Sequence, residues 1–183
     1  MQELLTGMED FIRKGKPLGF TLLDFWQFQF SNIWDLQEHI AEFLVAKALG
    51  IKRPYNRSGW TPFDILYRNT RIEVKETGYF YSWQKKGKIS QRRSFGINQT
   101  YNGKQIKERQ NDIYVFCLNT GETAKDSNPL ELEHWEFYVI PTKIINEKCR
   151  ANKTISLGRV RQLSPCILYK DLKNEIDKLI QLL

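Results

Sequence analysis

Histidine and cysteine are scarce in this chain, and their scarcity excludes several kinds of catalytic and metal site. Among 183 residues there are two histidines, His39 and His134, and three cysteines. Two histidines exclude a histidine-rich metal centre and argue against a cysteine–histidine protease. The cysteines lie far apart and match no zinc-ligand spacing, so we expect reduced, mostly buried thiols at Cys117, Cys149 and Cys166.

Long apolar runs and the common phosphate-binding and hydrolase motifs are missing as well. No run approaches the roughly 18 consecutive apolar residues of a membrane-spanning helix, so we expect no membrane partner. The chain begins Met-Gln-Glu, without the basic and then apolar segment of a secretory signal, which favours a cytoplasmic protein. There is no glycine-rich phosphate loop, no dinucleotide-binding fingerprint and no nucleophile elbow. No such motif therefore competes with the cluster of charged residues described below.

Positive charge is in excess, and it gathers in one part of the sequence. The net charge is +7, in a chain that is 41% hydrophobic and therefore globular in composition. The range 68–109 holds eleven Lys and Arg against three Glu, an excess of eight, so the remainder of the chain sums to −1. A concentrated basic segment of this kind is typical of a surface that binds a polyanion such as nucleic acid.

The sequence around Arg68-Asn69 predicts a β-hairpin. Two runs rich in aromatic and β-branched residues, 63–67 and 70–76, flank this dipeptide. With a two-residue loop, Tyr67 pairs with Thr70, and every later pair follows by counting outward. Because side chains alternate between the two faces of a strand, one face of the hairpin is apolar and the other is polar. The apolar face carries Phe63, Ile65, Ile72 and Val74.

The polar face of this hairpin carries two carboxylates and a lysine. The predicted pairing places Asp64 directly opposite Glu73, and Lys75 lies two residues further along the same face. Opposed carboxylates repel each other, so a fold keeps them where a positive charge lies between them. Mg²⁺ commonly binds one or two carboxylates together with substrate phosphate. The three side chains predict a site for phosphodiester hydrolysis; the alternative is an ordinary solvated hairpin face.

Asp64, a short gap and then Glu73-Val74-Lys75 resemble the signature of the PD-(D/E)xK, or restriction-endonuclease-like, nuclease superfamily. Phe63 stands between Pro62 and Asp64, so the proline of that signature is displaced by one residue. Members of the superfamily often add a glutamate from the helix that precedes the hairpin.

The helix predicted upstream of the hairpin supplies such a glutamate. Apolar residues at helical spacing predict a helix over 32–49, ended by Gly50. From Ile40 onward it resembles the first helix of a bacterial subset of the superfamily, in which the glutamate before an aromatic-Leu-Val-Ala run is functional. The resemblance assigns that role to Glu42, with Glu38, one turn earlier, in reserve; a plain helix-surface glutamate is the alternative.

The resemblance also implies an α/β fold. The core would be restriction-endonuclease-like, with a central mixed β-sheet flanked by helices, in a single domain over residues 1–183. Helical spacing over 1–13 and a second helix capped by Thr21 predict a helical extension over 1–31. Downstream we expect strands over 94–98, 112–118 and 135–140, helices over 141–146 and 169–183, and ambiguous structure over 155–157 and 160–163.

The activity implied by the resemblance is metal-dependent hydrolysis of phosphodiester bonds by a DNA endonuclease of restriction or repair type. Asp64 and Glu73 would bind Mg²⁺ or Mn²⁺, which would activate a water molecule. Lys75 would orient this water, help to deprotonate it and stabilise the growing negative charge. Glu42 would hold a metal-bound water, bind a second ion or position Lys75. Restriction enzymes of the superfamily often dimerise, so a homodimer is also considered, although no sequence feature establishes one.

A stretch rich in aromatic and basic residues follows the hairpin. Aromatic residues are dense over 77–84, and a basic turn spans 85–93. Interleaved rings and cations can stack on bases and contact phosphates, or can equally belong to a strand with one buried face. The resemblance also suggests a polar active-site helper at Gln84. The residues expected to contact DNA are Gln84, Lys85, Lys86, Lys88, Arg92 and Arg93.

Two other classes of function stay open at this point. The same basic and aromatic features would serve a nucleic-acid-binding module that keeps the scaffold without cleaving its ligand. A protein-interaction module that uses the aromatic N-terminal helices would instead bind DNA weakly or not at all. Metal-dependent cleavage separates the enzyme from the binding module, and a steep loss of affinity with rising salt identifies a true polyanion binder.

Overall fold

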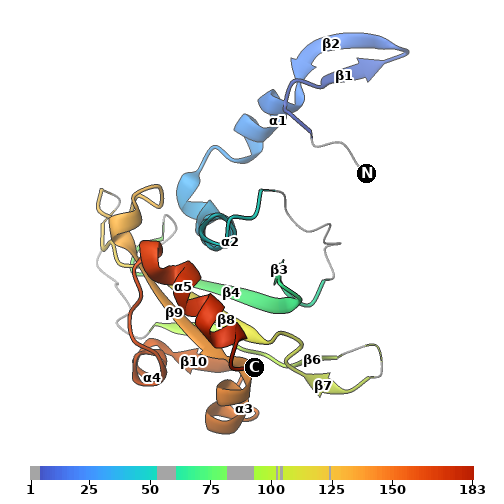
Figure 1. Cartoon of the computed structure of the whole chain (residues 1–183). Coiled ribbons are helices and arrows are strands. Elements are labelled where there is room, and N and C mark those ends of the chain that lie inside the picture. Colours follow the sequence, from blue (N-terminus) through green and yellow to red (C-terminus); the bar gives the residue numbers. More distant parts are fainter. Residues whose placement is uncertain (1–4, 53–60, 82–92, 102, 104, 124) are drawn as a thin grey trace. The chain divides into compact units, whose positions relative to one another are not determined.

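A computed structural model describes the chain over residues 5–52, 61–81, 93–101, 103, 105–123 and 125–183. Most of the residues predicted to contact DNA lie outside these ranges: Gln84, Lys85, Lys86, Lys88 and Arg92. The described residues divide into two compact units, one that ends at Leu36 and one that begins at Gln37 (Figure 1).

The first unit consists of a β-hairpin and a helix. Strand β1 (Asp10–Arg13) pairs antiparallel with β2 (Lys16–Thr21), and α1 (Leu22–Gln29) follows directly; a short 3-10 helix (Ile33–Leu36) ends the unit. The capping box at the start of α1 confirms the predicted helix cap, because Thr21 and Asp24 bond each other's backbone N–H groups.

The helix predicted over 1–13 is wrong, since the described part of that range contains β1, and the predicted helical extension is therefore a hairpin followed by a helix. Two residues of positive φ, Lys14 and Gly15, form a turn that reverses the chain. Pairing across the hairpin then brings the rings of Phe11 and Phe20 to 5.1 Å between centroids. Four apolar residues at helical spacing are a weak signal, and this cross-strand pairing outweighs it.

The second unit is built on a mixed sheet, in which the described residues provide four strands. Their order is β3 (Ile65–Tyr67), β4 (Thr70–Gly78), β8 (Ile113–Asn119) and β9 (Trp135–Pro141). The pair β4–β8 is parallel, and the other two pairs are antiparallel. All seven residues of β8 are buried, which confirms the central strand expected from its continuous apolar sequence.

Helices cover both faces of this sheet. On one face, α2 (Gln37–Ala48) and α5 (Tyr169–Ile180) pack on alternate residues of β8, including Val115. On the other face, α3 (Thr142–Cys149) and α4 (Leu157–Leu163) pack in a cluster that includes Phe116. The period of two along β8 separates the two clusters, so the sheet lies between two apolar layers. The predicted mixed α/β architecture is confirmed at this level.

Several expected elements are shifted or paired in a way that the sequence did not indicate. The helix predicted over 32–49 begins as the 3-10 turn and becomes α-helical at Gln37, and Gly50, with φ of 73°, follows its end. Strand β5 (Ser94–Gly96) pairs with β10 (Thr154–Ser156) outside the central sheet. A further short ladder joins β6 (Thr100–Tyr101) and β7 (Lys107–Glu108).

The three cysteines are all free, in agreement with the expectation of reduced thiols. Cys117 and Cys149 are buried as expected, whereas Cys166 is exposed, so the expectation of burial fails at this position. Cys166 lies in the turn between α4 and α5, where the chain runs over the surface.

The hairpin β3–β4 has the predicted pairing from Tyr67–Thr70 to Ile65–Ile72. The regular ladder ends there, and the N–H of Asp64 bonds to the carbonyl of Ile72, so the predicted Asp64–Glu73 pair is not part of the register. Arg68 and Asn69 have φ values of 49° and 64°, the left-handed conformation of a two-residue hairpin turn that matches the twist of the strands. The guanidinium of Arg68 also lies 3.1 Å from the carboxylate of Asp177 on α5, which ties the turn to the helix.

The turn gives a first prediction. Replacing Asn69 with valine should lower the free energy of unfolding by roughly 1–2 kcal/mol, because a β-branched residue tolerates positive φ poorly. Replacing Asn69 with glycine should leave stability unchanged or raise it. Urea unfolding of the two variants beside the wild type measures the difference, and equal stability of the valine and glycine variants would contradict the turn described here.

Candidate functional site

Asp64 lies immediately before β3 and extends the pairing of the hairpin with its side chain. Its backbone N–H donates to the carbonyl of Ile72 at 3.0 Å, and its Oδ2 accepts a hydrogen bond from the N–H of Val74 at 2.8 Å. The carboxylate thus takes the place that a backbone carbonyl would have in a longer ladder. Local pairing therefore fixes Asp64 beside the segment that carries Glu73.

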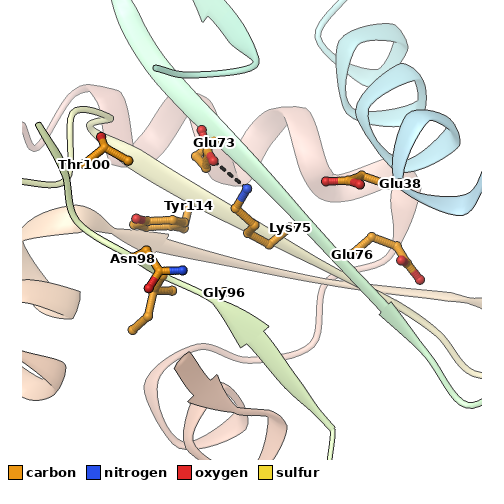
Figure 2. A pocket seen from close by; sticks show the side chains of 9 residues that line it. Glu38, Glu73, Lys75, Glu76, Gly96, Asn98, Thr100 and Tyr114 are labelled. Carbon is orange, nitrogen blue, oxygen red and sulfur yellow. Dashed lines mark ion pairs between the residues drawn. The ribbon is translucent and has the colours of Figure 1, made fainter. Parts of the chain in front are cut away.

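Glu73 and Lys75 form an ion pair on the polar face of β4 (Figure 2). The distance from Oε1 of Glu73 to Nζ of Lys75 is 2.6 Å, and the side chains are 18% and 28% exposed. Burial and the negative charge of Asp64 raise the pKa of the Glu73 carboxyl, and Lys75 opposes this shift. The predicted cluster of two carboxylates and a lysine is therefore present as a group of interacting charges.

Lys75 keeps its proton in this surrounding. Burial lowers the pKa of the lysine, but the carboxylates of Glu73, Asp64 and Glu38 outweigh it, and the net shift is upward. A lysine with a raised pKa is a poor general base near neutral pH. The arrangement suits Lys75 to electrostatic stabilisation and to orienting a nucleophile, rather than to deprotonating it.

Both glutamates predicted on the upstream helix act on this cluster. The negative charge of Glu42 contributes to the raised pKa of Glu73, and that of Glu38 contributes to the raised pKa of Lys75. Glu38, which the sequence placed in reserve, lines the cavity beside Lys75, whereas Glu42 and Asp64 are not among its lining residues. The assignment of a functional role to Glu42 stays a prediction.

A cavity of about 470 Å³ opens at Lys75. Its walls come from α2, from β4, from the range 96–100, which joins the end of β5 to the start of β6, and from β8. Figure 2 shows Lys75 on β4 with Tyr114 on one side and Glu38 on the other. The lining residues are Glu38, Glu73, Lys75, Glu76, Gly96, Ile97, Asn98, Thr100 and Tyr114.

Tyr114 is a wall residue that sequence reasoning missed. It is the partner of Glu73 in the parallel pairing of β4 with β8, and it is 2% exposed. Burial, followed by the charge of Glu73, raises the pKa of its hydroxyl, so the tyrosine is neutral. Only the parallel register brings Tyr114 to the site, and no local pattern in the sequence encodes that register.

Glu76 is a second residue that the sequence did not single out. Its Oε1 is buried and has no hydrogen-bond partner among the described residues. Burial, and then the charge of Glu38, raise the pKa of this carboxyl to about 8, although Tyr81 and Arg93 oppose the shift. The only sign of Glu76 in the sequence is its position directly after Lys75, at the end of the Glu73-Val74-Lys75 motif.

Arg93 is the one residue of the predicted DNA-contacting set that falls within the described ranges. It is 8% exposed, and its Nη2 donates to the carbonyl of Tyr79 at 2.8 Å. Its guanidinium also lies over the rings of Tyr79 and Tyr81, 5.5 and 5.9 Å from their centroids. These contacts give Arg93 a role in holding the chain beyond β4, and a contact with DNA stays a prediction.

The donor set at Asp64 and Glu73 fits a hard divalent cation. Among the described residues, no group of three or more His, Cys, Asp or Glu is placed to hold a metal ion. Two carboxylates are nevertheless a usual protein contribution to Mg²⁺, whose other ligands are water and substrate oxygens. Burial first, and the negative charge of Asp64 second, raise the pKa of Glu73, and a cation bound between the two carboxylates would favour the charged form of both.

No protein-family model, no curated protein and no solved structure matches the chain. None of the helices in the described ranges is long and apolar enough to cross a bilayer. A function for the chain is therefore inferred from the chemistry of its residues.

The buried carboxyl of Glu76 predicts a pH dependence of stability. Its pKa is about 8 in the folded protein against 4.5 for the ordinary group, so between these values the folded state binds more protons than the unfolded state. The free energy of unfolding should then fall as pH rises from about 4.5 to about 8, by an amount of the order of a few kcal/mol.

The Glu76→Gln variant isolates this effect, because glutamine does not titrate. Urea unfolding in EDTA should show the variant gaining stability relative to the wild type between about pH 5 and pH 8.5. A stability difference that stays constant over this range would mean that Glu76 titrates normally.

Proposed function

We propose that the chain is a metal-dependent DNA endonuclease of restriction or repair type, with Asp64, Glu73 and Lys75 at its active site. The observation that carries the proposal is the partly buried Glu73–Lys75 ion pair, held beside Asp64 by the hairpin and opening onto a cavity. This is the arrangement that the PD-(D/E)xK resemblance leads one to expect. A restriction-endonuclease-like core, built on the mixed sheet, belongs to the same proposal.

The charge of the cavity supports a requirement for a cation. Among the described lining residues, Glu38 and Glu73 face a single lysine, and Glu76, whose pKa is raised to about 8, adds a third negative charge only at higher pH. A phosphodiester is itself an anion, so these walls repel it unless a positive ion offsets their charge. The chain as a whole is basic, with its excess concentrated over 68–109, which favours a polyanionic substrate.

In the proposed reaction, a bound Mg²⁺ or Mn²⁺ would lower the pKa of a water molecule and offset the charge of the scissile phosphate. Asp64 and Glu73 would hold the ion. Lys75, which stays protonated, would bind the scissile phosphate and stabilise the negative charge that grows on it. The neutral hydroxyl of Tyr114 and the side chains of Asn98 and Thr100 offer uncharged hydrogen-bonding groups at the same cavity.

A nucleic-acid-binding module that does not cleave is the second candidate. The observation that favours it is the ion pair in which Lys75 already neutralises the charge of Glu73. In addition, the described residues contain no group of three or more His, Cys, Asp or Glu placed to hold a metal ion. Such a module would bind DNA through the basic segment without needing Asp64 or Glu73.

The test is cleavage of supercoiled plasmid and of single-stranded DNA in Mg²⁺, Mn²⁺ or EDTA. Glu73→Gln and Lys75→Met should each lower the rate by roughly 100-fold or more, because the first removes a charged metal ligand and the second removes the positive charge at the scissile phosphate. Lys148→Met is the matched control, because it makes the same substitution at an exposed position of α3 and should leave the rate unchanged.

Cleavage that persists in EDTA, or that survives in both active-site variants, would contradict the proposed site. Binding of DNA by well-folded wild type, with no cleavage in any metal, would instead favour the binding module. Its affinity should then fall steeply with salt and should not change in Glu73→Gln.

A further inference from the structure

Two buried oxygen atoms near the end of β4 have no hydrogen-bond donor among the described residues. One is Oε1 of Gln37, the first residue of α2. Gln37 is only 2% exposed. The other is Oε1 of Glu76. Leaving such an acceptor buried and unpaired destabilises the folded protein, more strongly if the acceptor is charged. Two occupants can satisfy the pair: a proton on Glu76, whose raised pKa favours the neutral acid below about pH 8, or a cation that binds both oxygens.

The orientation of the Gln37 amide is set by a neighbour. Its Nε2 donates to the carbonyl of Phe80 at 3.2 Å. Turning the amide over would place Oε1 against that carbonyl, so that two acceptors would face each other. The amide therefore keeps its oxygen on the side away from Phe80, and it cannot supply a donor to Glu76 without losing the bond to Phe80.

Both oxygens converge on Gly78. A Cβ atom at this position would lie 2.9 Å from Oε1 of Gln37 and 3.5 Å from Oε1 of Glu76. The glycine therefore lets both oxygens come close to the same point of β4, where the Cβ of Asn119 would lie 3.4 Å from a Gly78 Cβ. Glu38 follows Gln37 on α2, and its negative charge acts on Glu76. Figure 2 shows Glu38 and Glu76 on the same side of Lys75, away from Glu73 in this view.

We propose that Gln37, Glu38 and Glu76 form a cation site of their own, separate from the Asp64–Glu73 pair. The occupant is a divalent cation that takes oxygen ligands, such as Ca²⁺ or Mn²⁺. Carboxylates, amide oxygens and water are the ligands that Ca²⁺ uses in proteins, and the site offers two carboxylates and one amide. The cation would join the beginning of α2 to the end of β4. This inference does not depend on the proposed nuclease activity.

The test counts ions bound per chain by calorimetric titration of the full chain with Mn²⁺. In the Glu73→Gln variant, which lacks one of the two hairpin carboxylates, we expect one Mn²⁺ to remain bound. Adding Glu38→Gln, at an exposed position, should weaken this remaining binding by roughly tenfold or more, because a charged ligand is lost. Glu76→Gln should do the same, and Glu133→Gln, at an exposed position far along the sequence, should not.

A second measurement guards against variants that fold poorly. Ca²⁺ should raise the Tm of the wild type and of Glu73→Gln, but not the Tm of Glu76→Gln. The proposal is wrong if Glu73→Gln removes all Mn²⁺ binding, or if Glu38→Gln and Glu76→Gln both leave the ion in place. The proposal is also wrong if Ca²⁺ leaves the Tm of the wild type unchanged and Glu76→Gln is more stable than the wild type in the absence of any cation. That result would mean that Glu76 is a neutral acid that donates its proton to Gln37. Loss of cleavage in Glu73→Gln with this ion retained would separate the two sites.

Discussion

The pairing of Tyr67 with Thr70 is the constraint on which both the core and the candidate site depend. It fixes which residues of β4 face α2 and which face the cavity, because side chains alternate along a strand. A slip of one residue would turn Ile72 toward the polar face and would move Glu73 and Lys75 into the apolar layer. The two-residue turn at Arg68-Asn69 and the burial of one face therefore specify the site before any catalytic requirement is considered.

Local signals were sufficient for the elements whose pattern is strong over a short range. The hairpin pairing, the buried strand β8 and the capping of α1 by Thr21 could all be predicted from neighbouring residues. The expected helix over 1–13 failed because pairing between strands that form one hairpin outweighed a few apolar residues at helical spacing. Strand β5 was placed correctly, but its partner β10 lies about sixty residues further along the chain, beyond the reach of local patterns.

The candidate site divides in the same way. Asp64, Glu73 and Lys75 come from one hairpin, so counting along two strands was enough to bring them together. Tyr114 and Glu38 reach the cavity from β8 and α2, and their places depend on the parallel register and on helix packing. The chain as a whole is basic, whereas the cavity is lined by more glutamates than lysines, and this difference can be seen only once the structure brings the lining residues together. This contrast is what makes a cation part of the proposed chemistry.

The most direct test of the account is a crystal structure of the chain with Mn²⁺ and a short DNA duplex, in which anomalous scattering locates the metal. We expect a Mn²⁺ peak within ligand distance of both Asp64 and Glu73, with the side chain of Lys75 turned toward a phosphate of the DNA. A structure in which DNA is bound, the Glu73–Lys75 ion pair is unchanged and no metal lies between the two carboxylates would contradict the central claim.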